Sequence, residues 1–135
     1  MAEPKGYVDG HNIDKAARLD LQYIFPMPGV QSVGDDKTLR LVAGQDCTAI
    51  GAYAFAKTGP TGCDLRIEIQ AKTGAAAWRT IINSTTFHIN AGATTAEITD
   101  ACEPLFKNDQ LRVNIDQIGS GVAGSDVTVF LRVRF

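Results

Sequence analysis

The chain has 135 residues, about the size of one ordinary domain, and a formal net charge of −2 at pH 7. Hydrophobic residues make up 44% of it and charged residues 21%, so the composition excludes disordered, collagen-like and coiled-coil chains. Lysine and arginine are not concentrated anywhere, which argues against nucleic-acid binding, because that binding depends on neutralising phosphates. No apolar run approaches the roughly 20 residues of a membrane helix, and we expect no membrane partner.

Residues 1–20 differ from the rest of the chain in being polar, charged and poor in β-branched residues. Asn12 is an acceptable N-cap for a short helix, whose shared face would consist of Ile13, Ala16, Ala17 and Leu21. Such a short helix is marginal alone, so we interpret residues 1–20 as an arm that orders against the domain, a sister subunit or a larger partner. A disordered terminus is the alternative. The segment lacks the blocks of a signal peptide, which predicts a protein made in the cytoplasm.

From residue 21 onward, apolar and polar residues alternate in short runs, a pattern typical of β-strands. Pro26 and Pro28 are expected to end the first run. The later strands are expected at Thr38–Val42, Thr48–Lys57, Asp64–Gln70, Ala77–Asn83, Phe87–Ile89, Ala96–Thr99, Gln110–Gln117 and Asp126–Phe135. The glycine-rich segment 119–124 is expected to connect a hairpin. About eight short strands predict an all-β fold, an antiparallel, jelly-roll-like β-sandwich over residues 21–135.

Aromatic residues on the side of the strands opposite the core suggest a contact surface. Phe130 lies among polar residues on the outward side of the last strand, and Tyr53 and Phe55 are expected on the outward side of their own run. Several exposed aromatics on one surface favour a homo-oligomer, and the alternative is a second small core under the N-terminal arm. Trp78 falls within a strand pattern, and we expect it in the core.

The sequence shows no catalytic constellation, and we predict no enzyme activity, no cofactor and no metal site. His11 and His88 have no ligand partner at a metal-motif spacing. No serine lies in a nucleophile elbow, and a pairing of Cys102 with His88 is only a remote alternative. Several carboxylates are available for a small hydrolase, but most of them lie beside turns, where aspartate is favoured. Three cysteines without a paired motif are expected to be reduced thiols, mostly packed as small hydrophobic residues.

Four segments between Gly59 and Phe135 carry a resemblance. They are Gly59–Ile69, Ile89–Thr95, Asn108–Ser120 and Gly124–Val129. Together they resemble a β-sandwich domain of tail-fibre and capsid-decoration proteins of tailed bacteriophages, in which a Pro-x-Gly turn enters one strand and a glycine-rich loop precedes the last. The resemblance implies a homotrimer. No repetitive shaft precedes the domain, which favours a compact head protein over a fibre.

These observations predict a structural protein of the virion, most simply a capsid decoration or cement protein. It would bind the major capsid protein, or another virion protein, as a homo-oligomer and stabilise the shell. The residues expected at partner contacts are Tyr7, His11, Ile13, Leu19, Tyr53, Phe55 and Phe130. The alternatives are a tail-fibre, adaptor or receptor-binding domain of the phage tail, in which Trp78 reads a carbohydrate, and, remotely, a small β-sandwich hydrolase.

Overall fold

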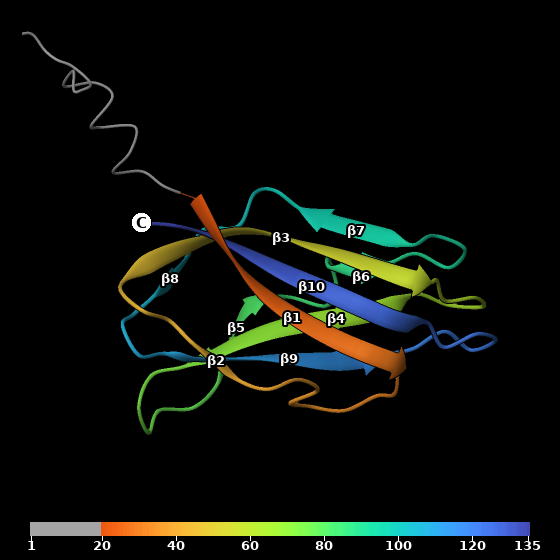
Figure 1. The fold of residues 1–135 in the computed structure, drawn as a ribbon, viewed down its shortest axis with the longest axis horizontal. Helices are drawn as coiled ribbons and strands as arrows, with labels where there is room; N and C mark the ends of the chain where they lie inside the picture. The colour runs from red at the N-terminus through yellow and green to blue at the C-terminus, as the bar shows by residue number, and fades with distance from the viewer. Residues whose placement is uncertain (1–19) are drawn as a thin grey trace, which may run out of the picture.

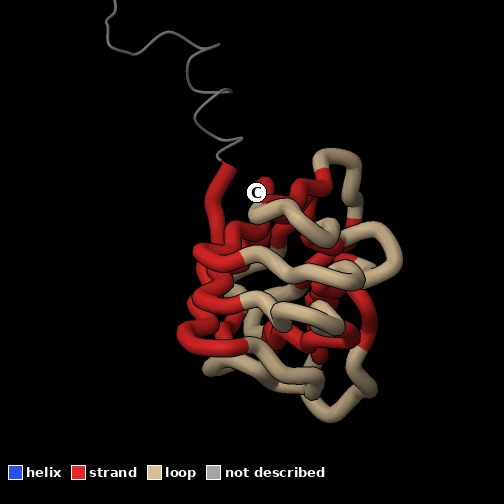
Figure 2. The backbone as a smooth tube through the Cα atoms, turned by 90° about the vertical axis from the view of Figure 1, so that its right-hand side faces the viewer, coloured by secondary structure: helices blue, strands red, loops and turns tan. Residues whose placement is uncertain are grey.

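The computed structural model describes residues 20–135, which form two antiparallel β-sheets and no helix (Figures 1 and 2). Sheet A consists of β1 (Asp20–Val30), β10 (Ser125–Arg134), β3 (Cys47–Thr58), β7 (Thr95–Ile98) and β8 (Glu103–Leu105). Sheet B consists of β2 (Leu41–Val42), β9 (Gln110–Gln117), β4 (Leu65–Lys72), β5 (Arg79–Ile82) and β6 (His88–Ile89). The described part of the chain contains no helix that would be long and apolar enough to cross a membrane.

The strand order is that of a jelly roll. Sheet A runs β1-β10-β3-β7 and sheet B runs β2-β9-β4-β5. The short strand β8 pairs with β3 beyond the end of β7, and the short strand β6 pairs with β4 beyond the end of β5. Ten strands therefore occupy eight ladder positions, in two facing sheets of four, as in a double Greek key. The predicted antiparallel jelly-roll-like sandwich is confirmed. Segment 119–124 is not a hairpin connector, however, because β9 and β10 lie in different sheets and the segment crosses between them.

The core follows from alternation along the central strands. On β10, Val127, Val129, Leu131 and Val133 are all buried, and β4 buries every second residue in the same way. The inward positions of the neighbouring strand β3 carry small side chains. They are Ala49, Ala52, Ala54 and Ala56, and none of them has exposed surface. They lie in one cluster with the larger side chains of sheet B. Small residues opposite large ones let the two sheets approach closely without voids.

The first strand differs from its prediction at both ends. β1 begins at Asp20 and runs through Pro26 and Pro28 to Val30, so the expected helix cannot reach Leu21 and the prolines do not end the strand. Proline is tolerated here because β1 is the edge strand of sheet A and pairs only with β10. On the free side of an edge strand the backbone N–H has no ladder hydrogen bond to make, so proline loses none. The predicted N-terminal arm, residues 1–20, lies outside the described part of the chain except for Asp20.

Three loops gather at one end of the sandwich, the end that faces the viewer in Figure 2. The turn after β3 donates the Thr61 N–H to the Val122 carbonyl at 2.9 Å, and the Pro60 carbonyl accepts the Gly92 N–H at 2.8 Å. Gly59 allows this packing, because a Cβ there would lie 1.9 Å from the Ala93 carbonyl oxygen. The loop motifs that carry the sequence resemblance are therefore brought together in space.

Candidate functional site

The predicted partner-contact residues fall into two groups. Tyr7, His11, Ile13 and Leu19 lie outside the described residues. Tyr53, Phe55 and Phe130 all lie on the outer face of sheet A, as expected from their strand positions. The rings of Tyr53 and Phe130 are tilted by 47° with centroids 6.0 Å apart, and the two residues are directly paired across β3 and β10. The structure thus brings the three aromatics onto one surface.

Ile24 extends this surface to the edge of the sheet. It pairs with Phe130 across β1 and β10, so one row of the outer face reads Ile24, Phe130, Tyr53. Ile24 is 51% exposed, and Phe55, which lies two residues beyond Tyr53 on β3, is 46% exposed. We call these four residues the aromatic patch. Large apolar side chains that remain half exposed on a rigid sheet face are typical of a contact surface.

Ion pairs line the side of the patch that lies nearer the start of β1. Arg132 donates to Glu97 at 2.9 Å, and Arg134 donates to Asp20 at 2.8 Å. The Arg134 guanidinium lowers the pKa of the Asp20 carboxyl through this hydrogen bond. These pairs are largely exposed and contribute little stability on their own. They place charge along one side of an apolar centre, as part of the polar rim of a protein–protein interface does.

A second apolar surface, which the sequence reading missed, lies along the adjoining side of the sandwich. The chain leaves β1, runs beside β9 and enters β2, with Gly34 bridged to Ile115 (Figure 1). This segment carries four large apolar residues that point into solvent, and we call them the border: Val30, Val33, Leu39 and Val42, with Leu39 89% and Val30 78% exposed. Val30 ends β1 at the edge of sheet A, and the residues after it run along the outer edge of sheet B, where no further strand lies beside them.

The outer face of sheet B is polar, in contrast to that of sheet A. Arg112 donates to Gln70 at 2.9 Å, and the buried Asn114 amide donates to Glu68 and to Gln70. Neighbouring strands thus satisfy one another's polar groups with side chains of this same face. Two atoms at the end of this face where β4 pairs with β6, Arg66 Nε and His88 Nδ1, are buried without a hydrogen-bond partner among the described residues.

Trp78 is not a core residue, contrary to the prediction. It precedes β5, is half-buried, and lies against cations of the polar face, with the Arg112 guanidinium 4.1 Å and that of Arg40 5.0 Å from its ring centroid. Lys72 adds a third cation at 5.7 Å. Cation–π contacts of this kind stabilise a partly exposed indole at the surface. Because side chains of the same chain already cover the ring, the structure does not favour its use as a sugar-stacking platform.

Asp109 forms the most buried polar anchor among the described residues. Its carboxylate is fully buried and accepts hydrogen bonds from Thr73 Oγ1 at 2.6 Å, Arg79 Nη2 at 2.7 Å and the Phe106 N–H at 2.9 Å. Burial raises the pKa of the Asp109 carboxyl, but the three donors and the Arg79 charge together outweigh it and leave the pKa lowered. The group joins the β4–β5 turn to the segment before β9, and its partners indicate a structural role.

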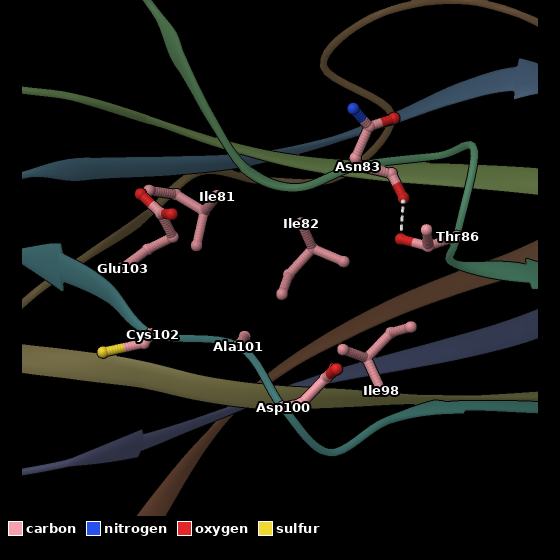
Figure 3. Close-up of a pocket in the computed structure, with 9 residues that line it drawn as sticks. All are labelled: Ile81, Ile82, Asn83, Thr86, Ile98, Asp100, Ala101, Cys102 and Glu103. Carbon is pink, nitrogen blue, oxygen red and sulfur yellow. Dashed lines mark hydrogen bonds between the residues drawn. The ribbon is translucent and has the colours of Figure 1, made fainter.

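A hollow of about 240 Å³ opens on the opposite side of the sandwich, between β5 and the β7–β8 segment (Figure 3). Ile82 and Ile98 point into it from the two sheets, Asp100 lies beside Ile98, and Cys102 is directed away. Among residues 20–135, no three His, Cys, Asp or Glu side chains converge to hold a metal ion. His88 is on β6 and does not line the hollow; its Nδ1 lies 3.2 Å from Asp64 Oδ2.

The three cysteines are free. Cys47 is buried, Cys63 is half-buried with its Sγ 3.1 Å from the Ile118 carbonyl, and Cys102 is exposed. Burial, followed by the charges of Asp109 and Asp46, raises the pKa of the Cys47 thiol. Cys47 fits the expectation of a thiol packed as a small hydrophobic residue, whereas Cys102 does not.

No protein-family model matches the chain, and no curated protein matches it. Among solved structures, the chain is similar to a chain of infectious bursal disease virus, Gx strain, with 14% identity and a TM-score of 0.40 over 88% of this chain and 31% of that one. It is also similar to a capsid chain of Helicobacter pylori bacteriophage KHP30, with 9% identity and a TM-score of 0.41 over 87% and 90% of the two chains. The Drosophila NLP core matches with 9% identity and a TM-score of 0.42 over 84% and 95%. The chain spans less than a third of the bursal disease virus chain.

Proposed function

We propose that this protein is a non-enzymatic structural protein of a bacteriophage particle, a capsid decoration protein that binds the outer shell as a homo-oligomer. One observation carries the proposal. Among residues 20–135, a well-packed jelly roll exposes large apolar side chains at the aromatic patch and along the border. Surfaces of this kind serve contact with other proteins. The loop motifs that resemble phage β-sandwich domains support the same assignment.

The mechanism is mechanical. Oligomerisation buries apolar surface, and the arm of residues 1–19 reaches from the start of β1 onto neighbouring capsid subunits, with Tyr7, His11, Ile13 and Leu19 as its contact residues. Binding then favours the assembled shell over its separated subunits, because a ligand stabilises the state to which it binds.

Shell binding by the full chain and by a variant that lacks residues 1–19 tests this function. Shells assembled without the protein are mixed with each form, and bound protein and the shell's disruption temperature are measured. We expect the full chain to bind and to raise that temperature, and the shortened chain to remain folded but to bind at least about tenfold more weakly, a loss of about 1.4 kcal/mol. Equal binding by the two forms would refute the role of the arm.

Location in the particle is the second measurement. Antibody against the folded domain should label the whole surface of intact virions in electron micrographs. Label confined to the tail would replace the decoration role with the tail-adaptor role. Absence of the chain from purified virions would reject both. A Val122→Ser variant is the matched control in the binding assay, since Val122 is an exposed apolar residue in the β9–β10 connector and belongs to neither the patch nor the border.

A further inference from the structure

The hollow between β5 and the β7–β8 segment combines apolar walls with unpaired charge. Ile81 and Ile82 of β5 and Ile98 of β7 form its apolar part, and the two residues of β5 are buried. Of the residues between 20 and 135 that line it, Asp100 and Glu103 carry the only charges, and both are exposed. Figure 3 shows the two carboxylates at the margin of the hollow, on different sides of Ile82.

These two carboxylates differ from others on the molecule in lacking a counter-charge. Asp36, Asp109 and Glu97 each pair with an arginine. Neither Asp100 nor Glu103 pairs with a cation of the described residues, and no lysine, arginine or histidine in that part of the chain lines the hollow. A cation supplied by another molecule would complement the charge of this site.

The backbone holds the hollow in a fixed shape. Ala52 of β3 pairs with Ile98 and Ala49 pairs with Glu103, so two residues of β3 lie opposite the four residues 99–102. The additional residues form a bulge, which takes Asp100 out of the ladder and re-aims its side chain. Ala101 still donates its N–H to the Ile50 carbonyl at 3.2 Å.

Gly51 fixes the other side of this segment. A Cβ at Gly51 would lie 2.3 Å from the Ile98 carbonyl oxygen, so β7 packs directly on the backbone of β3. On the facing sheet, Ile82 is held by its pairing with Ile69 of β4. A site that is formed before binding does not have to be ordered by its ligand, which favours affinity.

We propose that the hollow receives a basic side chain, an arginine, of the capsid subunit to which this protein binds. The inference rests on the proposed function and deepens it by naming a contact. An arginine has an apolar stem, which would lie on Ile82 and Ile98, and a planar guanidinium with several donors, which would bridge Asp100 and Glu103. Two acceptors on different sides suit this fork better than the compact ammonium of lysine.

The size of the hollow favours a single side chain over a complete small molecule. Its volume is about 240 Å³, below the roughly 300–1,000 Å³ that is typical of small-molecule sites. Arginine is also one of the residues that most often anchor protein–protein interfaces. The occupant is therefore expected to be part of a protein surface.

A charge-removing double variant tests the site. Asp100→Asn combined with Glu103→Gln keeps the shape of both side chains and removes both charges. The matched control combines Asp35→Asn with Asp126→Asn, two exposed carboxylates outside the hollow, and changes the net charge by the same amount. An asparagine at position 126 keeps an oxygen that accepts the Gly29 N–H. Circular dichroism and thermal unfolding verify that both proteins fold.

The first measurement uses the purified chain without shells. N-acetylarginine methylamide is the probe, its neutral citrulline analogue is the comparison, and the methyl resonances of Ile82 and Ile98 report binding by NMR. We expect the arginine probe to shift these resonances in the unmodified chain and in the control. The citrulline probe, and the arginine probe on the double variant, should each bind at least about tenfold more weakly, because the charge pair is removed.

The second measurement is binding to shells assembled without the protein. The double variant should bind at least about tenfold more weakly than the control, as expected when a charged interface contact is lost. Equal shell binding by the two variants overturns the inference and leaves the decoration function standing. Equal binding of the arginine and citrulline probes also overturns it, because the hollow then does not recognise charge.

Failure of the proposed function has a different result. An unmodified chain that binds no shell, yet takes the arginine probe in the hollow, rejects the decoration function. The same result supports the hollow as a site for a basic side chain, since the NMR measurement involves no shell.

Discussion

Replacement of Asp109 is expected to be the most informative single change for stability, because its carboxylate is fully buried and accepts three hydrogen bonds. Asp109→Ala would take the carboxylate away from Arg79 and Thr73, and Arg79 would keep only its hydrogen bonds to Thr73 Oγ1 and the Pro104 carbonyl. Removing one member of a buried charged pair costs about 3–5 kcal/mol. The Arg79 side chain is 32% exposed, so water can solvate the guanidinium that remains, and we expect the lower end, about 3 kcal/mol.

That loss corresponds to a fall in Tm of about 10 °C for a domain of this size. Urea unfolding at pH 7, followed by circular dichroism, measures it directly. The matched control is Asp35→Asn, a change at a largely exposed carboxylate, which should alter the free energy of unfolding by less than about 0.5 kcal/mol. An Asp109→Ala protein that is as stable as the control would refute the anchor.

The pH dependence gives an independent check. The pKa of Asp109 is lowered in the folded protein, so its contribution is fully present above the unfolded-state pKa, which is about 3.9. The contribution is lost as the pH falls through the lower folded-state pKa. The difference in the free energy of unfolding between the unmodified chain and Asp109→Asn should therefore be constant from neutral pH down to about 4, and should shrink below it. A difference that persists unchanged at low pH would show that shape, and not charge, is responsible.

Three further predictions follow from the strand faces and turns. In urea unfolding, Phe25→Ala should lower the free energy of unfolding by about 3–5 kcal/mol, because Phe25 is buried. Ile24→Ala, on the exposed face of β1, should lower it by less than about 1 kcal/mol. Similar losses for the two variants would mean that the strand register is wrong. Gly59→Ala should destabilise by more than about 2 kcal/mol because its Cβ would meet a carbonyl oxygen, whereas Gly44→Ala, with nothing within 4 Å, should be neutral or slightly stabilising. A thiol reagent should modify Cys102 rapidly in the folded protein, because Cys102 is the exposed cysteine. The fast phase should be absent in Cys102→Ser, and a fast phase that persists in this variant would contradict the prediction.

The central strands were predictable because both their faces follow a simple rule. The alternation from Gln110 to Gln117 predicts β9 to the residue, and β4 and β10 differ by two residues or fewer at each end. In these strands each inward residue is apolar and each neighbour is largely polar, so the sequence pattern and the burial pattern are the same. The outward aromatics were found by the same reasoning.

The edges were not predictable, because their structure depends on what lies beside them. Pro26 would end a central strand but is tolerated in β1, which pairs on one side only. The short strand β8 contains Pro104 and exists because β3 is long enough to hold two partners in sequence along one edge. Asp109 meets Arg79 across 30 positions of sequence, and nothing local signals that pairing. The border was missed for a related reason: Leu39 was assigned to an expected strand at Thr38–Val42, whereas the strand comprises only Leu41 and Val42 and leaves Leu39 exposed before it.

The two outer faces bear on function through what a single folded chain requires. Tyr53 and Phe130 lie on the solvent side of central strands. Threonine also has a high β-propensity and suits such positions, and Thr128 occupies one on the same face. Their aromatic identity therefore is not needed to form the sandwich. On the polar face, by contrast, the one large aromatic side chain among the described residues, Trp78, is covered by Arg112 and its neighbours, so its ring already has contacts within the folded chain.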